Sequence, residues 1–557
     1  MTEVSALQTE RYRYEPKVPA ILRQDVGMIA VKKAGETGGA GNQRELQRRF
    51  PHIYGAPAAL FKRGENPPAK KRYNVGVVLS GGPAPGGHNV IAGLLDSLKQ
   101  GNPRSKLYGF LNGPAGLINC AYREITPKIL QPYRNTGGFD IIGSGRDKVE
   151  TPDQFRAAAE TAAKLDLDAV VIVGGDDSNT NAAVLAEHFA SSGAKTRFIG
   201  VPKTIDGDLK NEFIETSFGF DSATKVYSQL VGNIARDACS SRKYWHFIKV
   251  MGRSASHIAL ECALQTQANI CLISEEVEAR GLTLAQITED ISRAVAARAE
   301  GGENFGVVII PEGLVEFIPE IKKLIGELNG QMAKKADEFN ALRSFQDKRA
   351  WLGANLSEES MGAFNTLPEG IAAEFLIDRD PHGNVQVSRI ETERLLATLV
   401  EQRVAVLKKE GKFHGNFASY THFFGYEGRC GAPSNFDADY CYALGKTAFM
   451  LLASGLNGYL ASVRNLTAPP SKWTAGGVPL TSLMHIETRK GEPKPVIKKA
   501  LVDLKGPVFR ALAAKREEWA LKTSYLFPGS PQYFGPAGVS DRATKTLVLE
   551  SLGAKKK

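Results

Sequence analysis

The stretch VVIVGGDDSNTNAAVLAEHF, residues 170–189, contains the strongest structural signal in the chain. An apolar run over residues 169–173 ends at Gly174 and Gly175, and two acids, Asp176 and Asp177, follow directly. Apolar residues then recur at helical spacing, at Ala182, Leu185, Ala186 and Phe189. The pattern predicts a strand, a glycine turn and a helix, with acid side chains at the carboxyl edge of a sheet, where ligands of α/β proteins bind.

Such a turn has the chemistry of a phosphate site. Glycines let backbone amides approach phosphate oxygens closely, and a carboxylate beside them can hold Mg²⁺ against the phosphate. One acid is enough for that role. The second acid, Asp177, would repel an anionic ligand and therefore needs a separate explanation.

Composition limits the class of protein. The chain has 557 residues, 43% hydrophobic and 23% charged, which predicts a water-soluble globular protein of two to four domains. No apolar run is long enough to span a bilayer, and the N-terminus lacks the basic-then-apolar pattern of a secretory signal. We therefore expect a cytoplasmic protein with no membrane partner.

Cysteine, histidine and charge patterns exclude several kinds of site. The six cysteines show no CxxC spacing, which predicts buried thiols in a reducing compartment. The nine histidines form no HExxH pattern, which argues against zinc. The net charge of +10 comes from dispersed Lys and Arg rather than one basic stripe, so we expect small anionic substrates and no nucleic acid.

The strand, glycine turn and helix occur a second time. NVGVVLS, GGPAPGGHN and VIAGLLDSLK follow one another over residues 74–99, and further apolar strands are expected near residues 198–201, 247–250 and 305–310. Strands that alternate with helical segments indicate parallel sheets. The predicted fold class is α/β, with two doubly wound, Rossmann-like parallel-sheet domains.

Changes in composition and in hydrophobic periodicity along the chain suggest the domain boundaries. Residues 1–72 read as an N-terminal extension, 73–221 as a phosphate-donor domain, and 222–465 as a second α/β domain. Helical periodicity in FIPEIKKLIGELNG and in RIETERLLATLVEQRVAVLKKEG predicts a helical insertion at about 315–410, with Gly411 as a helix C-cap. Residues 466–557 are expected to pack back on the first domain.

A third element adds reactive groups. PKTIDGDLKN, residues 202–211, offers a cation, a hydroxyl and two carboxylates in one loop after the strand FIGV. Phosphoryl transfer needs a carboxylate to accept the proton of an attacking hydroxyl, and cations to neutralise the transferring group. The loop therefore predicts a phosphotransferase.

Six motifs in a fixed order carry a family resemblance. LSGGPAPGGHN, GGDDSNT, PKTIDGD, MGRSASH, PEG and GYEGRC together resemble the phosphofructokinase family over about residues 73–465, and more narrowly its long pyrophosphate-dependent branch. The resemblance implies reversible transfer of a phosphoryl group from pyrophosphate to the 1-hydroxyl of fructose 6-phosphate. The reverse substrates are fructose 1,6-bisphosphate and phosphate, and the implied cofactor is Mg²⁺.

The resemblance also assigns roles to residues of this chain. It implies Asp206 as the general base, Asp176 as the Mg²⁺ ligand, and Gly81 and Arg146 beside the phosphate donor. The residues implied at the sugar phosphate are Thr204, Ile205, Asp206, Met251, Gly252, Arg253, Glu312, Tyr426, Glu427, Gly428 and Arg429. Lys243 and Tyr244 fall where the family places contacts from a neighbouring subunit, which implies at least a homodimer with shared active sites.

Two residues indicate which molecule donates the phosphoryl group. The ATP-using relatives carry glycine where this chain has Asp177 and Lys203, so the resemblance makes both residues determinants of catalysis and of donor choice. A carboxylate about 4 Å from the α-phosphate of ATP would repel it by roughly 4 kcal/mol at an effective dielectric near 20. Lys203 would supply a cation to the leaving phosphate. Both residues therefore point to pyrophosphate.

Three alternatives remain at this point. The nearest is an ATP-dependent phosphofructokinase with an unusual donor loop. The second is an inactive regulatory subunit, which is expected to lose acids that are present here, namely Asp176, Asp206 and Asp208. The third is an NAD-kinase-like or diacylglycerol-kinase-like protein, because those families also use a GGD turn, although they lack PKTIDGD and MGRSASH.

Overall fold

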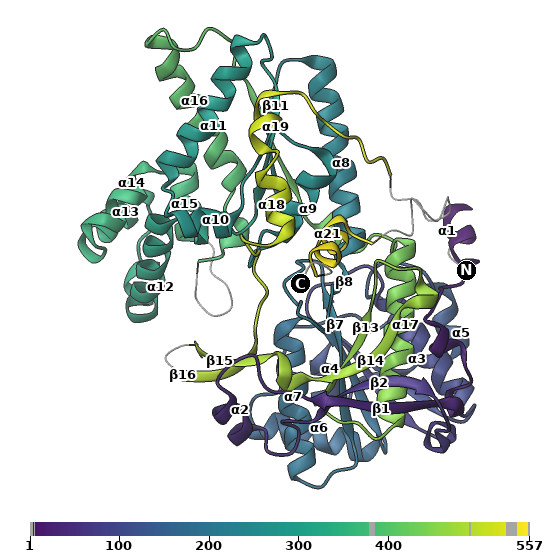
Figure 1. Ribbon diagram of the computed structural model, residues 1–557. Coiled ribbons are helices and arrows are strands. Elements are labelled where there is room, and N and C mark those ends of the chain that lie inside the picture. Colours follow the sequence, from purple (N-terminus) through teal and green to yellow (C-terminus); the bar gives the residue numbers. More distant parts are fainter. Residues whose placement is uncertain (1–3, 5, 378–384, 490–491, 531–542, 555–557) are drawn as a thin grey trace. The chain divides into compact units, whose positions relative to one another are not determined.

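The computed structural model describes residues 4, 6–377, 385–489, 492–530 and 543–554. The chain forms two compact units. The first consists mainly of the chain up to Thr224 together with Tyr426–Ala500, and the second mainly of Lys225–Gly425 and Leu501–Ser530. Each unit contains its own central sheet (Figure 1).

The first unit is built on a ten-stranded mixed sheet. Its order is β1-β2-β14-β13-β7-β6-β3-β4-β5, and β8 pairs with β7. The strands β13, β7, β6, β3 and β4 run parallel to their neighbours in that series. Their bounds are β13 Tyr459–Arg464, β7 Arg197–Thr204, β6 Ala169–Gly174, β3 Asn74–Leu79 and β4 Lys106–Phe110. β3 and β6 are buried along their whole length, as a central parallel strand requires.

Antiparallel strands extend this sheet, which departs from the predicted parallel arrangement. The N-terminal extension supplies β1 Ile29–Glu36 and β2 Pro57–Arg63, and β14 Thr474–Pro479 joins β2 to β13. At the other edge β5 Tyr122–Glu124 pairs antiparallel with β4. Short connections favour antiparallel neighbours, and β13 and β14 are such a pair. No pattern in residues 1–72 predicts that they would complete a sheet.

The connections of the parallel strands create a crevice. The chain passes from β3 through α3 Gly87–Gly101 to β4 on one side of β3, and then returns to β6 on the other side. Ligands of doubly wound sheets bind where the strand order reverses in this way, at the carboxyl ends of the strands. The two glycine turns found in the sequence follow β3 and β6, so they meet at this point.

Helices α3 and α17 Asn435–Ala453 pack closely beside this sheet (Figure 1). A Cβ placed at Gly93 of α3 would collide with the carbonyl of Tyr442, and one at Gly445 of α17 would collide with the carbonyl of Val90. One glycine on each helix thus lets the two backbones approach. Other helices that begin in this unit are α1 Ala6–Arg11, α2 Gln43–Arg49, α4 Pro114–Ile118, α5 Pro127–Leu130, α6 Pro152–Lys164, α7 Asp176–Ser191, α8 Phe220–Ser241 and α21 Lys545–Ala554.

The second unit has a four-stranded parallel sheet in the order β10-β11-β9-β12. Its strands are β10 Ile270–Cys271, β11 Gly306–Pro311, β9 Trp245–Val250 and β12 Ser419–Phe424. Val250, Pro311 and Phe424 are level with one another in the register. Residues that follow these three strands therefore share one edge of the sheet.

Helices dominate the rest of the second unit. After β11 come α12 Pro319–Asn340, α13 Phe345–Asn355, α14 Glu358–Thr366, α15 Glu369–Ile377 and α16 Thr392–Lys409. Gly411 follows α16 with φ of +69°, and its N–H bonds to the carbonyl of Lys408, so the predicted C-cap is confirmed. The other helices are α9 His257–Thr266, α10 Ser274–Arg280, α11 Leu284–Glu300, α18 Pro507–Ala513 and α19 Arg516–Leu521.

Two general expectations can be compared with the structure. Of the six cysteines Cys262 and Cys441 are buried, whereas Cys430 is exposed and the other three are intermediate, so the prediction of uniformly buried thiols is wrong. Across the ranges that the structure describes, every helix is too short or too polar to cross a bilayer.

Candidate active site

The two glycine turns lie side by side in the first unit. The register pairs Leu79 at the end of β3 with Val173 near the end of β6, and the N–H of Ser80 donates to the carbonyl of Val173. The hydroxyl of Ser178, in the first turn of α7, lies 2.8 Å from the hydroxyl of Ser80. The start of helix α7 is thereby fixed against the first glycine turn.

Two cations approach the first glycine turn. The Nζ of Lys203 donates to the carbonyl of Gly82 at 2.9 Å. A Cβ at Gly81, where φ is +82°, would lie 3.1 Å from the same Nζ, and a Cβ at Gly82 would collide with the guanidinium of Arg429. The glycines are therefore needed both for the turn and for the space that Lys203 and Arg429 occupy.

Lys203 is a buried cation with a shifted pKa. Burial lowers the pKa of its ammonium group from 10.5 to about 8, and the charges of Arg429 and Arg146 act in the same direction. The carboxylates of Asp206 and Asp176 oppose this shift. Lys203 therefore lies close enough to Arg429 and Arg146 for their charges to act on it.

Carboxylates face these cations. Asp206 lies in the loop after β7, and its N–H donates to the hydroxyl of Thr204 at 3.1 Å. Burial raises the pKa of Asp206, and burial together with the charges of Asp206 and Asp176 raises the pKa of Asp208 to about 7. Asp206 and Asp176 are thus close enough to Asp208 to disfavour its ionisation.

These carboxylates fit a magnesium site in their chemistry. Mg²⁺ is usually bound by one or two carboxylates, several waters and the phosphate of a substrate, rather than by a cage of protein ligands. Within the described part of the chain no group of three or more His, Cys, Asp or Glu side chains has metal-binding geometry. A single ligand such as Asp176, beside buried acids whose repulsion a cation would reduce, agrees with both observations.

Asp177 is paired with a lysine that the sequence analysis did not single out. The Nζ of Lys148 lies 3.2 Å from its carboxylate, and the two side chains are 38% and 51% exposed. The pair cancels part of the charge of Asp177, and solvent screens the remainder. The repulsion of roughly 4 kcal/mol estimated for ATP is therefore an upper limit.

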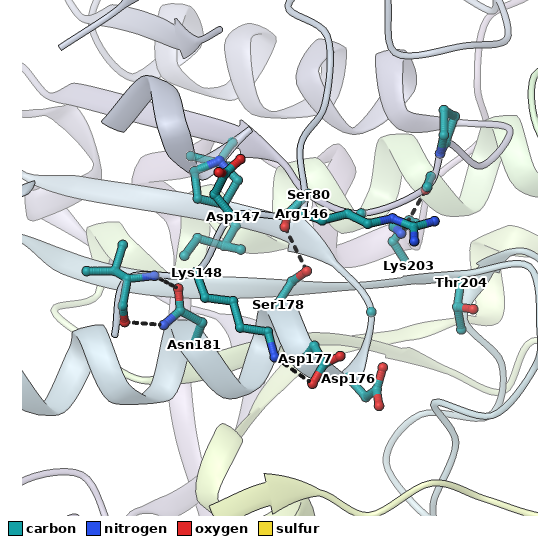
Figure 2. A pocket seen from close by; sticks show the side chains of 18 of the residues that line it. Ser80, Arg146, Asp147, Lys148, Asp176, Asp177, Ser178, Asn181, Lys203 and Thr204 are labelled. Atoms are coloured by element: carbon teal, nitrogen blue, oxygen red, sulfur yellow. Dashed lines mark hydrogen bonds and ion pairs between the residues drawn. The ribbon is translucent and has the colours of Figure 1, made fainter. Parts of the chain in front are cut away.

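The groups surround one small cavity of about 250 Å³. Figure 2 shows Arg146 and Lys203 on one side of the view and Asp176 and Asp177 on another. Pockets for drug-sized ligands measure roughly 300–1,000 Å³, so this cavity lies just below that range. The predicted site residues that line it are Gly81, Arg146, Asp176, Asp177, Lys203, Thr204, Ile205, Asp206 and Arg429.

A second group of predicted residues lies in the second unit. Met251 directly follows β9, and Glu312 directly follows β11, at the edge where the strands end together. The Glu312 carboxylate accepts from the N–H of Gly252 at 3.0 Å, and Arg253 lies 3.9 Å from Glu316. Met251, Gly252, Arg253 and Glu312 therefore form one local cluster.

Lys243 and Tyr244 lie at the other end of the same sheet. They precede β9, whereas Met251 follows it, and a six-residue strand separates the two positions by roughly 20 Å. The ring of Tyr244 packs against Tyr420 of β12, with centroids 4.6 Å apart. The structure therefore does not bring Lys243 and Tyr244 to the Met251 cluster of their own chain.

The residues of the motif GYEGRC differ in their position relative to the cavity. Tyr426, Glu427 and Gly428 form a single 3-10 turn, and Tyr426 is 75% exposed. Of the four predicted residues 426–429, Arg429 lines the cavity.

Several lining or neighbouring residues were missed by the sequence analysis. Lys148 lies two residues after Arg146, so the motif IIGSGRDK offered a signal for it. Asn181 lines the cavity from α7, and its side chain bonds both to the N–H and to the carbonyl of Val149. Lys499 lies 3.6 Å from Asp176 and comes from a segment with no recognisable motif.

Known proteins are similar to this chain in sequence. The sequence profile of the phosphofructokinase family matches residues 74–347. A pyrophosphate–fructose 6-phosphate 1-phosphotransferase from Treponema pallidum is 58% identical over 98% of this chain and 97% of its own length. A protein of the same name from Entamoeba histolytica is 53% identical over 98% of this chain and 99% of its own length.

A solved structure supports the fold. A pyrophosphate-dependent phosphofructokinase from Marinobacter aquaeolei aligns with a TM-score of 0.50 and 19% identity, covering 73% of this chain and 83% of that one. At that identity the likeness concerns the fold alone. The near full-length relatives establish that the chain belongs to the phosphofructokinase family, among the pyrophosphate–fructose 6-phosphate 1-phosphotransferases.

Proposed function

We propose that this chain catalyses reversible, Mg²⁺-dependent transfer of a phosphoryl group from pyrophosphate to the 1-hydroxyl of D-fructose 6-phosphate. The products are fructose 1,6-bisphosphate and phosphate. The observation that carries the proposal is the small cavity in which Lys203, Arg146 and Arg429 face Asp176 and Asp206. Membership of the phosphofructokinase family excludes the NAD-kinase-like or diacylglycerol-kinase-like alternative.

Asp206 serves as the general base in this proposal. A base that takes the proton of a sugar hydroxyl works best when its pKa approaches the working pH. Burial raises the pKa of Asp206 in that direction, while Arg429 and Lys499 limit the rise. The bond from Asp206 N–H to Thr204 helps to fix the loop that carries the carboxylate.

The cations stabilise the group being transferred. Lys203 lies over the first glycine turn, where its charge reaches the donor and the leaving phosphate, and Arg146 lines the same cavity. Groups already in position when charge develops need no reorganisation during the reaction. When bound at Asp176, Mg²⁺ would neutralise phosphate oxygens and so assist the departure of the leaving phosphate.

Asp177 and Lys203 set the choice of donor. Asp177 adds bulk and negative charge to the lining of a cavity already suited to a small anion. Lys203 supplies the charge that a nucleoside-free donor needs for its orientation. Both features favour pyrophosphate over ATP.

The proposal also assigns the residues that bind the sugar phosphate and those that a partner subunit provides. Met251, Gly252, Arg253 and Glu312, with residues 426–429, bind fructose 6-phosphate. Residues 222–465 form the sugar domain, and residues 73–221 form the donor domain. Lys243 and Tyr244 contribute to the site of a second copy in a homodimer. The chain acts in the cytoplasm in this proposal, where reducing conditions keep thiols reduced.

One assay tests the function. An aldolase-coupled assay with fructose 6-phosphate should give rapid turnover with pyrophosphate and little or none with ATP. Asp206→Asn should reduce kcat by roughly 10²–10⁴ without abolishing substrate binding. Faster turnover with ATP than with pyrophosphate would instead support the ATP-dependent alternative, and inactivity with both donors would support the regulatory-subunit alternative.

A further inference from the structure

Lys499 lies beside the acids of the donor site, although it belongs to the C-terminal part of the first unit. Its Nζ is 3.6 Å from the Asp176 carboxylate and 3.9 Å from the Asp208 carboxylate. The Lys499 side chain is 35% exposed, whereas those of Asp176 and Asp208 are 20% and 7% exposed. A single ammonium group is thus shared between two acids that come from different elements.

The backbone on both sides of Lys499 is fixed to those same elements. The N–H of Ile497, at the end of β16 Glu492–Ile497, donates to the hydroxyl of Thr180 on helix α7 at 3.0 Å. The N–H of Ala500 donates to the carbonyl of Asp208 at 2.7 Å. Lys499 is therefore held between the helix that begins at Asp176 and the loop that contains Asp206 and Asp208.

The two separations are longer than those of close ion pairs elsewhere in the chain. The Lys249–Glu393 pair, for example, has an N–O distance of 3.0 Å. A lysine ammonium group is charged at neutral pH. At 3.6 and 3.9 Å it balances the carboxylates of Asp176 and Asp208 without closing fully on either.

We propose that Lys499 is a positioning residue that neutralises Asp176 and Asp208 in the ligand-free protein and that Mg²⁺ displaces from Asp176. This inference rests on the proposed function only through the assignment of Asp176 as the metal ligand. A divalent cation has the stronger attraction for a carboxylate, and the flexible four-carbon stem of lysine lets its head group move away. Lys499 then acts as an internal competitor that weakens metal binding until the phosphate donor adds its own charge.

Metal binding by the ligand-free protein tests the proposal without measuring activity. Mn²⁺ also prefers oxygen ligands, and its free concentration can be followed by electron paramagnetic resonance. Lys499→Met should tighten Mn²⁺ binding by roughly five- to tenfold, because the competing charge is lost. Lys499→Arg keeps the charge and should bind Mn²⁺ nearly as the wild type does. Lys498→Met is the matched control, since the neighbouring Lys498 is exposed.

The possible results of the Mn²⁺ binding measurement either support the proposal or contradict it. Tighter binding in Lys499→Met alone supports the proposal. Unchanged or weaker binding in that variant contradicts it, as does equal tightening in Lys499→Arg or in Lys498→Met. Absence of Mn²⁺ binding in both the wild type and Lys499→Met also overturns it. If Lys499→Met does not fold, Lys499→Gln replaces it with the same expected tightening. Failure of the wild type in the pyrophosphate assay would count against the proposed function, since the metal titration requires no turnover.

Discussion

The carboxylate of Asp177 lies 3.2 Å from the ammonium group of Lys148, so the acid that distinguishes the donor turn is not an isolated charge. Asp177 lies at the second position of α7, where the positive end of the helix also favours an acid. Its charge is therefore stabilised by two features of the first unit. A negative group maintained in this way can discriminate between donors at little cost in stability.

Removing the acid should widen donor use. Asp177→Gly takes away both the bulk and the charge of the carboxylate, and we expect the ratio of ATP to pyrophosphate turnover to rise by roughly ten- to a hundredfold. Asp177→Gly combined with Lys203→Gly should raise this ratio further, while activity with pyrophosphate collapses. The two donors are compared in the aldolase-coupled assay. If neither variant changes the ratio, the proposed mechanism of donor choice is wrong.

Lys148 should act through Asp177. Without its partner, Asp177 repels pyrophosphate as well, so Lys148→Met should raise the KM for pyrophosphate by about two- to fivefold, the range expected for an exposed ion pair. In the Asp177→Gly background the same substitution should have no effect, which a double-mutant cycle measures. Lys164→Met, at an exposed position on α6, is the control. An effect of Lys148→Met that persists without Asp177 would show direct contact between Lys148 and the donor.

The sequence predicted the parts of this site that depend on local pattern. The glycine turns after β3 and β6 and the loop after β7 were placed correctly at strand ends, because apolar runs and glycines signal such turns directly. Residues that are distant in the sequence but close in the structure had no such signal. Lys499 reaches Asp176 from a position more than 300 residues later, and the hydrogen bonds of Ile497 to Thr180 and of Ala500 to Asp208 hold it there.

The same difference between local and long-range signals determines which parts of the fold the sequence could predict. Alternating strands and helices indicated the parallel core, whereas β1 and β2 join it through β14, which is distant in the sequence. Pairing between such strands depends on side chains and register at both partners, so a single segment read alone does not reveal it. The likeness to known relatives, rather than any pattern, suggested the separate role of Lys243 and Tyr244.

The activity with pyrophosphate should decline at alkaline pH. Burial lowers the pKa of Lys203 to about 8, so the free enzyme loses this cation as the pH rises above that value. We expect kcat/KM for pyrophosphate to fall above about pH 8, as a pH profile would show. Lys203→Arg keeps its charge because a guanidinium has a pKa above about 12, and its alkaline limb should move to higher pH. An identical limb in both enzymes would exclude Lys203 as its source.

Burial of Asp208 should make the stability of the ligand-free protein depend on pH. The pKa of Asp208 is raised from 3.8 to about 7, so between these values the folded chain binds more protons than the unfolded chain. Its contribution to the free energy of unfolding therefore falls as the pH rises through this window, by about 4 kcal/mol in total. Below pH 3.8 both states are protonated and this contribution no longer changes with pH.

Asp208→Asn should remove that dependence. Thermal unfolding at pH 5 and pH 8 without ligands measures it, and the Tm of the variant relative to wild type should be higher at pH 8 than at pH 5. Asp153→Asn, at a position that is 86% exposed at the start of α6, should show no such difference. A relative Tm for Asp208→Asn that is equal at both pH values would contradict the raised pKa.

The position of Lys243 and Tyr244 leads to a test of shared active sites. They precede β9 and lie roughly 20 Å from the Met251 cluster that follows it, so they are available to a second copy of the chain. We expect Asp206→Asn and Lys243→Ala each to be nearly inactive as homodimers. In a mixed dimer one site has both substitutions and the other has neither. Mixing the two variants under conditions that exchange subunits should therefore restore about a quarter of wild-type activity, since half of the dimers are mixed and half of their sites are intact.

The restored activity should be found in the fractions that contain dimers in size-exclusion chromatography. If mixing restores no activity although subunits exchange, Lys243 acts within its own subunit and the shared site is ruled out.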